Sequence, residues 1–439
     1  MNRQGPADSE SRAASTRAAP ATAPLHPVVR ATGWVSFFTD LGSELIYPLL
    51  PDFVTGTLHA SRRTFGLIEG LAEGMPSIVK LWSGALADRA RSRKGLIFAG
   101  YLLSSSVKPF LGLAQSATGV LGLRLLDKIG KGIRGAPRDA VVADFAGGQR
   151  GRAFGYQRAM DHAGAVAGGL AGFLLLRVVG VDLRLAIMLS AIPGFIALLV
   201  IALFVRDDPV RRAAGGVRAA DGGGATAPVP LSREFRFYLV AAVLFALANS
   251  SDAFLILRAR EMGLPLLMAP LAWALLHVVK SVTSLWGGGL SDRVGRRPVL
   301  LAGWVLYALV YGAFAWLTAA WATWLLFAAY GIFFGATEGV AKAYVADLVP
   351  SAARGRAFGL LGMVEGLALI PTSFAIGWLW DTTGSGRAPL ALEAGLALLA
   401  ATWLALGCGG RARLRRGPGW AKLPPASERF TAFPARRRR

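Results

Sequence analysis

Residues 126–145 read LDKIGKGIRGAPRDAVVADF, and basic residues recur along this stretch every three or four positions. On an α-helix, which turns 100° per residue, Asp127, Lys131, Arg134 and Arg138 fall within an arc of about 60°. The surrounding chain is mostly apolar. A charged side chain that faces lipid is costly, so this face is expected to point into a water-filled cavity or toward partner charges.

Three other apolar stretches, at 33–54, 64–87 and 152–176, also carry charged faces at helical spacing. Their polar side chains are Asp40, Ser43, Glu44, Tyr47, Glu69, Glu73, Lys80, Arg158, Asp161 and His162. Desolvation raises the pKa of a carboxyl group toward neutrality, so acids in a partly wet cavity can exchange protons. The predicted proton carriers are Asp40, Glu44, Glu73 and Asp161.

The second part of the chain has fewer such groups, and together with the first part it supplies candidates for a solute cavity. The cavity candidates are Tyr47, Lys80, Lys131, Arg134, Asn249, Asp252, His277, Lys280 and Glu365. Lysine and arginine at 131, 134 and 280 could meet an anionic group of a solute. Two alternatives stay open: the charges pair internally and only orient helices, and the histidines serve packing.

Composition identifies the class of protein. The chain has 439 residues, of which 54% are hydrophobic and only 17% are charged, whereas soluble domains carry roughly a quarter charged residues. The net charge of +22 does not indicate nucleic-acid binding, because the arginines gather in alternate loops and in the tails. That pattern predicts a multi-pass protein of the cell (inner or plasma) membrane with both termini in the cytoplasm.

Apolar runs long enough to cross a bilayer predict twelve membrane spans. Their approximate limits are 33–54, 64–87, 95–115, 118–142, 152–176, 185–205, 234–257, 267–290, 298–316, 321–346, 355–379 and 388–408. The predicted domains are a disordered cytoplasmic tail (1–32), a six-helix bundle (33–205), a cytoplasmic linker (206–233), a second six-helix bundle (234–409) and a basic cytoplasmic tail (410–439). The fold class is therefore all-α and polytopic.

The two halves of the chain repeat one another. The stretch WSGALADRARSRKGLIFAG, from Trp82, matches WGGGLSDRVGRRPVLLAG, from Trp286, and RGRAFG occurs near both 150 and 354. Trp82 and Trp286 are 204 residues apart, as are Phe154 and Phe358. Two separate motifs with one offset predict a duplicated bundle with a pseudo-twofold axis along the membrane normal.

The paired Gly-x-Leu-x-Asp-Arg loops resemble the loop signature of the major facilitator superfamily (MFS), in a bacterial and archaeal branch whose substrates are mostly unknown. The resemblance covers residues 33–408 and implies a secondary transporter with a cytoplasmic gate. The gate residues that it implies are Gly84, Asp88, Arg89, Arg93, Arg138, Gly288, Asp292, Arg293 and Arg296. We expect Asp88 to pair with Arg138.

Other kinds of site are not indicated. GKGIRG at 130–135 lacks the order of a phosphate-binding loop, no His/Cys cluster has metal-ligand spacing, and Cys408 is the only cysteine. We therefore expect no enzyme activity, no cofactor and no metal, and a monomer whose partners are a small-molecule solute, protons and the lipid bilayer.

A glycine-rich stretch in the fifth predicted span bears on the direction of transport. GAVAGG at 164–169 resembles the antiporter signature of the superfamily, with Ala165 in place of proline. It favours proton-coupled export of a drug or metabolite. The alternatives are proton-coupled uptake of an organic anion, and a membrane sensor or scaffold that keeps the fold of a transporter.

Overall fold

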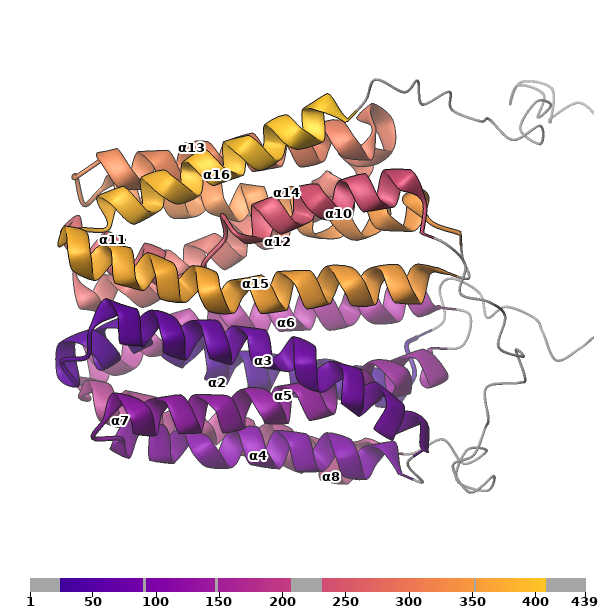
Figure 1. Ribbon diagram of the computed structural model, residues 1–439. Coiled ribbons are helices and arrows are strands. Elements are labelled where there is room, and N and C mark those ends of the chain that lie inside the picture. The colour runs from indigo at the N-terminus through magenta and orange to yellow at the C-terminus, as the bar shows by residue number, and fades with distance from the viewer. Residues whose placement is uncertain (1–23, 90–91, 147–148, 207–230, 351–352, 408–439) are drawn as a thin grey trace, which may run out of the picture.

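The computed structural model describes residues 24–89, 92–146, 149–206, 231–350 and 353–407, which form helices joined by short turns. The predicted N-terminal tail up to residue 23, the linker from 207 to 230 and the C-terminal tail from 408 onward lie outside these ranges. Figure 1 shows the helices of the first half, indigo to magenta, on one side of the molecule and those of the second half, pink to yellow, on the other.

The elements follow the predicted order. The first half contains α2 (Pro27–Ile46), η2 (Tyr47–Leu49), η3 (Asp52–Thr57), α3 (Arg62–Arg89), α4 (Arg93–Leu113), α5 (Ala117–Phe145), α6 (Arg150–Leu174), η4 (Leu175–Val179), α7 (Leu183–Leu189) and α8 (Ala191–Phe204). The second half contains α10 (Arg233–Ala246), α11 (Ala253–Glu261), η5 (Leu266–Met268), α12 (Ala269–Val294), α13 (Arg296–Trp316), α14 (Ala322–Leu348), α15 (Arg354–Thr383) and α16 (Arg387–Leu406). Together they form the predicted twelve membrane-length segments.

These segments run between two ends of the molecule. We call the terminal end the one at which α2 begins and α16 finishes, and the far end the one that carries the turns at 58–61 and 384–386. In Figure 1, α3 and α15 lie side by side where the two halves meet, and α6 and α12 form a second contact between the halves.

The first helix begins at Pro27, inside the segment that was expected to be a disordered tail. His26 accepts a hydrogen bond from the Val28 backbone N–H through Nδ1, at 3.2 Å. Proline is tolerated in the first turn because the N–H that it lacks has no partner within the helix. The local chemistry of these residues therefore starts the helix earlier than the hydrophobic pattern suggested.

The seventh segment is broken, although it was expected to be a continuous helix over 234–257. Helix α10 ends at Ala246 and α11 begins at Ala253, with the sequence LANSSD between them. Side chains from other helices bind the freed backbone groups: Glu393 accepts from the Ser250 N–H at 2.9 Å, and Ser373 from the Ser251 N–H at 3.0 Å. Asn, Ser and Asp favour such breaks because they compete for backbone hydrogen bonds.

Eight segments are long and apolar enough to cross a membrane, judged by length and composition. The four others are α2, α3, α5 and the broken pair α10–α11. Three of these carry the charged faces described above, and the fourth is interrupted. Charged residues lower the hydropathy of α2, α3 and α5. The same residues identify these helices as ones that must turn a polar face toward the protein interior.

The duplication is visible in a contact between equivalent positions. The Tyr47 hydroxyl lies 3.3 Å from Ser251 Oγ, and the two residues are 204 positions apart. Equivalent residues can touch only close to the axis that relates the halves, so η2 and the break before α11 lie beside this axis.

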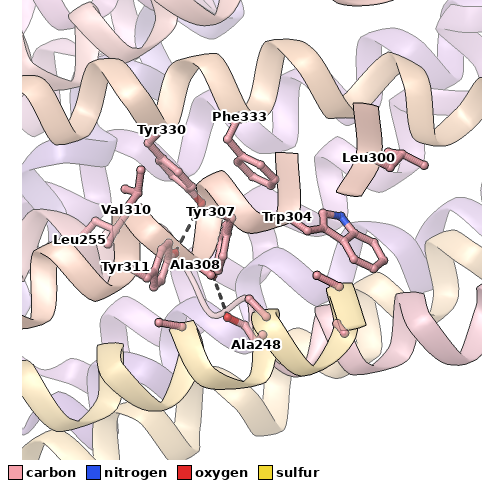
Figure 2. Packing of buried hydrophobic residues seen from close by; sticks show 14 of the residues in the cluster. Ala248, Leu255, Leu300, Trp304, Tyr307, Ala308, Val310, Tyr311, Tyr330 and Phe333 are labelled. Atoms are coloured by element: carbon pink, nitrogen blue, oxygen red, sulfur yellow. Dashed lines mark hydrogen bonds between the residues drawn. The ribbon is translucent and has the colours of Figure 1, made fainter. Parts of the chain in front are cut away.

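A large aromatic core holds the second half together (Figure 2). Tyr307 and Tyr311 stack with their ring centroids 4.1 Å apart, and the Tyr307 hydroxyl donates to the Ala248 carbonyl at 2.7 Å. Tyr330 and Phe333 pack against Tyr307 from α14. Because tyrosine combines apolar area with a hydroxyl group, this core also supplies hydrogen bonds to the broken segment.

Candidate functional site

Three adjoining cavities lie among the described helices. The central cavity (about 420 Å³) and the terminal-side cavity (about 410 Å³) share Glu44, Lys131, Arg134 and Lys280 on their walls. The aromatic cavity (about 320 Å³) joins the central one at Asn249, Phe334, Glu365 and Leu369. The shared wall residues place the three cavities next to one another, from the interface of the halves into the second half.

All the predicted proton carriers and cavity residues lie on these walls. Those of the central cavity are Glu44, Tyr47, Glu73, Lys131, Arg134, Asn249, Asp252, His277, Lys280 and Glu365. Asp40, Lys80 and Asp161 line the terminal-side cavity. The charged faces of four helices therefore converge on one space.

Helices α3 and α5 are joined by buried ion pairs. Arg124 Nη2 donates to Glu69 Oε1 at 2.8 Å, with 7% and 1% of the side chains exposed. Lys128 pairs with Glu73, which also lies 3.7 Å from Arg124. Glu69 and Glu73 have the same i, i+4 spacing as Arg124 and Lys128, so each pair of residues spans one helical turn. This pairing between helices was not predicted from the sequence.

Two acids on the opposite wall are unpaired. Asp40 of α2 and Asp161 of α6 both line the terminal-side cavity, and neither forms an ion pair or a hydrogen bond within the part of the chain that the structure describes. Helices α2 and α6 pack closely because Gly164 lies against the Phe37 backbone. These carboxyl groups are therefore the ones on this wall that a proton can neutralise without breaking a contact.

The two halves exchange polar contacts across the cavities. Trp273 Nε1 of α12 donates to Glu44 of α2 at 2.8 Å, and His277 Nε2 lies 3.7 Å from the same carboxylate. Among the described residues, neither ring nitrogen of His277 has a hydrogen-bond partner. Glu338 of α14 forms an ion pair with Lys280 at 3.1 Å and another with Arg158 of α6 at 3.5 Å.

The broken seventh segment brings Asn249 and Asp252 to the central cavity. Tyr330 donates to Asp252 at 2.5 Å, and Tyr307 to Asn249 at 3.3 Å. Glu393 of α16, which is fully buried behind the break, was not predicted from the sequence. A single acid in a predicted span gives no sign that it binds a backbone N–H of another helix.

The gate motif gives each half a matching ion pair. Arg93 pairs with Asp144, and Arg296 pairs with Asp347 at 2.5 Å and with Asp292 at 3.3 Å. The two acids at the ends of α5 and α14 were missed, although each is the Asp of a VAD sequence that occurs in both halves. The structure does not describe the side chains of Asp88 and Arg89 or the surroundings of Gly84 and Gly288.

The remaining gate residues lie at the terminal end of their helices. Arg138 donates to Ser36 at 3.1 Å and lies 3.3 Å from Asp139. Asp139 also lies 3.8 Å from Lys80. Arg293 is exposed at the end of α12. The expected pairing of Asp88 with Arg138 stays a prediction.

Two polar contacts join the halves at the far end. Arg260 Nε lies 3.0 Å from Asp52, and Asp381 of α15 accepts from the backbone N–H groups of Arg62 and Arg63 at 2.9 Å each. The second contact places a carboxylate at the positive N-terminus of α3. We refer to these two contacts as the far-end clamp.

Replacement of Asp381 by alanine is expected to loosen this clamp. A carboxylate at a helix N-terminus contributes about 1 kcal/mol, so the population open at the far end should rise roughly fivefold. The readout is the rate at which a membrane-impermeant maleimide labels Ala253→Cys in a Cys408→Ser background. Thr382→Ala is the control, since its hydroxyl donates only within its own helix. Equal labelling rates for both variants would contradict the clamp.

Comparison of the sequence with known proteins identifies a family. The family model described as Major Facilitator Superfamily matches residues 32–279 and 271–437. An uncharacterized MFS-type transporter of Methanocaldococcus jannaschii is 34% identical over 380 residues, covering 84% of this chain and 93% of the relative. The tetracycline resistance protein, class B, of Escherichia coli is 39% identical over 97 residues, which cover 22% of this chain and 24% of that protein.

Solved structures share the fold at low identity. The nucleoside transporter NupG superposes with a TM-score of 0.70 at 14% identity, covering 88% of this chain and all of the other. A bacterial homolog of the human lysosomal transporter Spinster, in an inward-facing and occupied conformation, gives 0.69 at 17% identity, with 86% and 96% covered.

Proposed function

The chain belongs to the major facilitator superfamily, and from this premise we propose that it is a secondary active transporter that moves a small organic solute by alternating access, coupled to protons in the direction of export. The observation that carries the proposal is the set of adjoining, charged cavities between two halves whose described residues meet tightly at the far end. We further propose a monomer in the cell membrane with the terminal end in the cytoplasm.

The asymmetry of the interface supports alternating access. At the far end, Gly66 of α3 and Gly377 of α15 each lie against the backbone of the other helix, and Gly169 of α6 lies against Pro270 of α12. Toward the terminal end the wall residues are open: the side chains of Lys80 and Arg158 are 60% and 59% exposed. With the terminal end in the cytoplasm, this conformation faces inward.

Proton coupling is supported by the unpaired acids. Asp40 and Asp161 share a cavity with Lys131 and Arg134, so a change of their charge alters the field at the basic wall. Export is supported by the partial similarity to resistance proteins of Escherichia coli and Cronobacter sakazakii, and by the GAVAGG stretch of α6.

A second candidate is proton-coupled uptake of an organic anion. It is favoured by the basic wall of α5, where Lys131 and Arg134 face the central cavity without a carboxylate partner among the described side chains. Neutral acids at Asp40 and Asp161 would leave this wall more positive. An anion and a proton would then travel in the same direction.

Replacement of the coupling acids tests the proposal. In proteoliposomes with an imposed pH gradient, Asp40→Asn and Asp161→Asn are expected to lower solute-dependent proton flux at least tenfold, because the amide cannot titrate. Glu73→Gln should also lower it, since Glu73 holds Lys128. Solutes come from a panel of organic anions and lipophilic cations, and the amount of protein in the membrane is measured for every variant.

The outcomes separate the candidates. Export and uptake differ in the direction of flux relative to the orientation of the protein. Full proton flux in both aspartate variants would remove proton coupling from these positions. If the folded wild-type protein gives no flux with any solute of the panel, the result favours the alternative of a membrane sensor or scaffold.

A further inference from the structure

Three basic side chains on the first-half wall of the central cavity lack a carboxylate partner. Lys108 of α4, Lys131 and Arg134 all line this cavity and form no ion pair with any acid for which the structure describes a side chain. Lys108 and Arg134 are only 4% and 7% exposed. A buried positive charge without an ion-pair partner is costly.

Of these three side chains, Arg134 would gain most from an anionic partner. Its guanidinium lies over the Tyr101 ring, 3.9 Å from the centroid, and its Nη1 is buried without a hydrogen-bond partner among the described residues. Arginine cannot relieve this cost by losing its proton. Lys108 has one weak contact, to Ser43 Oγ at 3.4 Å.

The acids near this wall only partly balance it. Asp127 and Glu44 line the central cavity and Asp40 the terminal-side cavity, but none of them forms an ion pair with Lys108 among the described residues. Glu73 is already held by Lys128 and Arg124. The wall therefore keeps basic side chains without an ion pair beside a cavity large enough for a small solute.

The aromatic cavity, which adjoins the central one, is lined mainly by apolar and aromatic side chains. Phe245 and Trp304 stack on its wall with centroids 4.6 Å apart and an interplanar angle of 9°, and Phe333 adjoins Phe245. Phe334, under the Lys280 ammonium at 4.4 Å, lies where this cavity joins the central one. A flat ring fits such a wall through stacking and edge contacts.

We propose that the two cavities form one bipartite site for an aromatic organic anion, whose anionic group binds Lys108, Lys131 and Arg134 while its ring enters the aromatic cavity beyond Phe334. This inference rests on the proposed transport function and names the class of its solute. Pockets that bind small molecules commonly combine an apolar body with a few convergent charged groups.

Equilibrium binding to the purified full chain in detergent tests the site. The probes are 1-naphthoate, 1-naphthylmethylammonium and acetate, measured by calorimetry. We expect 1-naphthoate to bind at least tenfold more tightly than either of the others, because only it offers both features. Lys131→Gln should weaken 1-naphthoate about tenfold, whereas Lys131→Arg should retain most of the affinity.

The aromatic cavity is tested separately with Phe334→Ala. This change should weaken 1-naphthoate several-fold and leave acetate binding unaltered. Arg177→Gln is the matched control, because this exposed arginine of η4 lies away from the cavities. The midpoint of thermal unfolding is recorded for each variant, so that a loss of fold is recognised.

Three results would overturn the inference: no binding of 1-naphthoate, tighter binding of the ammonium probe, or affinity that is unchanged in Lys131→Gln. Binding is measured without a membrane gradient, so it does not depend on translocation. Tight binding of the ammonium probe would overturn the anion site and leave transport intact. Tight binding of 1-naphthoate without any movement in proteoliposomes would keep the site and remove the transport function.

Discussion

Glu69→Ala is expected to destabilise the protein by about 3 kcal/mol, since removal of one partner of a buried ion pair leaves the other charge uncompensated. Arg124 would keep only Glu73, which lies 3.7 Å away and is shared with Lys128. The Nε of Arg124 already lacks a hydrogen-bond partner among the described residues. The lost Glu69 also accepts a hydrogen bond from Ser251 across the halves, at 3.4 Å.

The double variant Glu69→Leu/Arg124→Met makes the test specific. If the loss comes from an unpaired charge, replacement of both partners should restore most of the thermal stability of the purified protein. The control is Lys342→Ala, whose ion pair with Glu338 is more than half exposed on the lysine side. That variant should cost less than about 1 kcal/mol. A double variant that is less stable than Glu69→Ala would contradict the explanation.

Which helices turn a polar face inward could be predicted from the sequence. The stripe of Lys131, Arg134 and Arg138 was found from spacing alone, because the cost of charge in lipid dictates the direction of the face. The duplicated fold followed from the 204-residue offset, and the contact between Tyr47 and Ser251 has that same separation.

The partners of those charges could not be predicted, because the rotation and depth of each helix decide them. Glu73 was expected to carry protons, whereas the structure places it between Lys128 and Arg124. Its assignment as a carrier stays a prediction. Asp40 and Asp161, by contrast, lie on the terminal-side cavity without such partners.

The far-end clamp was also beyond reach of the sequence. Asp52 and Asp381 lie close to turns, where acidic residues are common and usually only face water. Their contacts cross from one half to the other, to Arg260 and to the first N–H groups of α3. A pairing between segments more than 200 residues apart leaves no local pattern in a single sequence.

Gly66→Ala is expected to separate the halves at the far end, with at least about a fivefold shift of the population toward the conformation that is open there. A Cβ atom at position 66 would lie 2.1 Å from the Ser373 carbonyl oxygen and 2.9 Å from its carbon. Both are backbone atoms of α15, so no side chain can move aside. Overpacking of this kind costs about 1–3 kcal/mol, and here the cost falls on the closed conformation only.

Gly122→Ala of α5 is the control, because a Cβ atom there meets nothing within 4 Å. It should be neutral or slightly stabilising, since alanine favours the helix by up to about 1 kcal/mol. Labelling of Ala253→Cys from the far end and the thermal midpoint are measured together in both glycine variants.

Two models of the protein predict different results for Gly66→Ala. In an alternating-access transporter the far end must open during each cycle, so the variant has a second conformation in which the added methyl group fits. Labelling at residue 253 then becomes faster, the thermal midpoint changes little, and solute transport falls at least tenfold. In a static scaffold no such conformation exists, so the same clash lowers the thermal midpoint and leaves the labelling of the folded protein slow. The combination of fast labelling and retained stability is therefore the signature of a moving interface between α3 and α15.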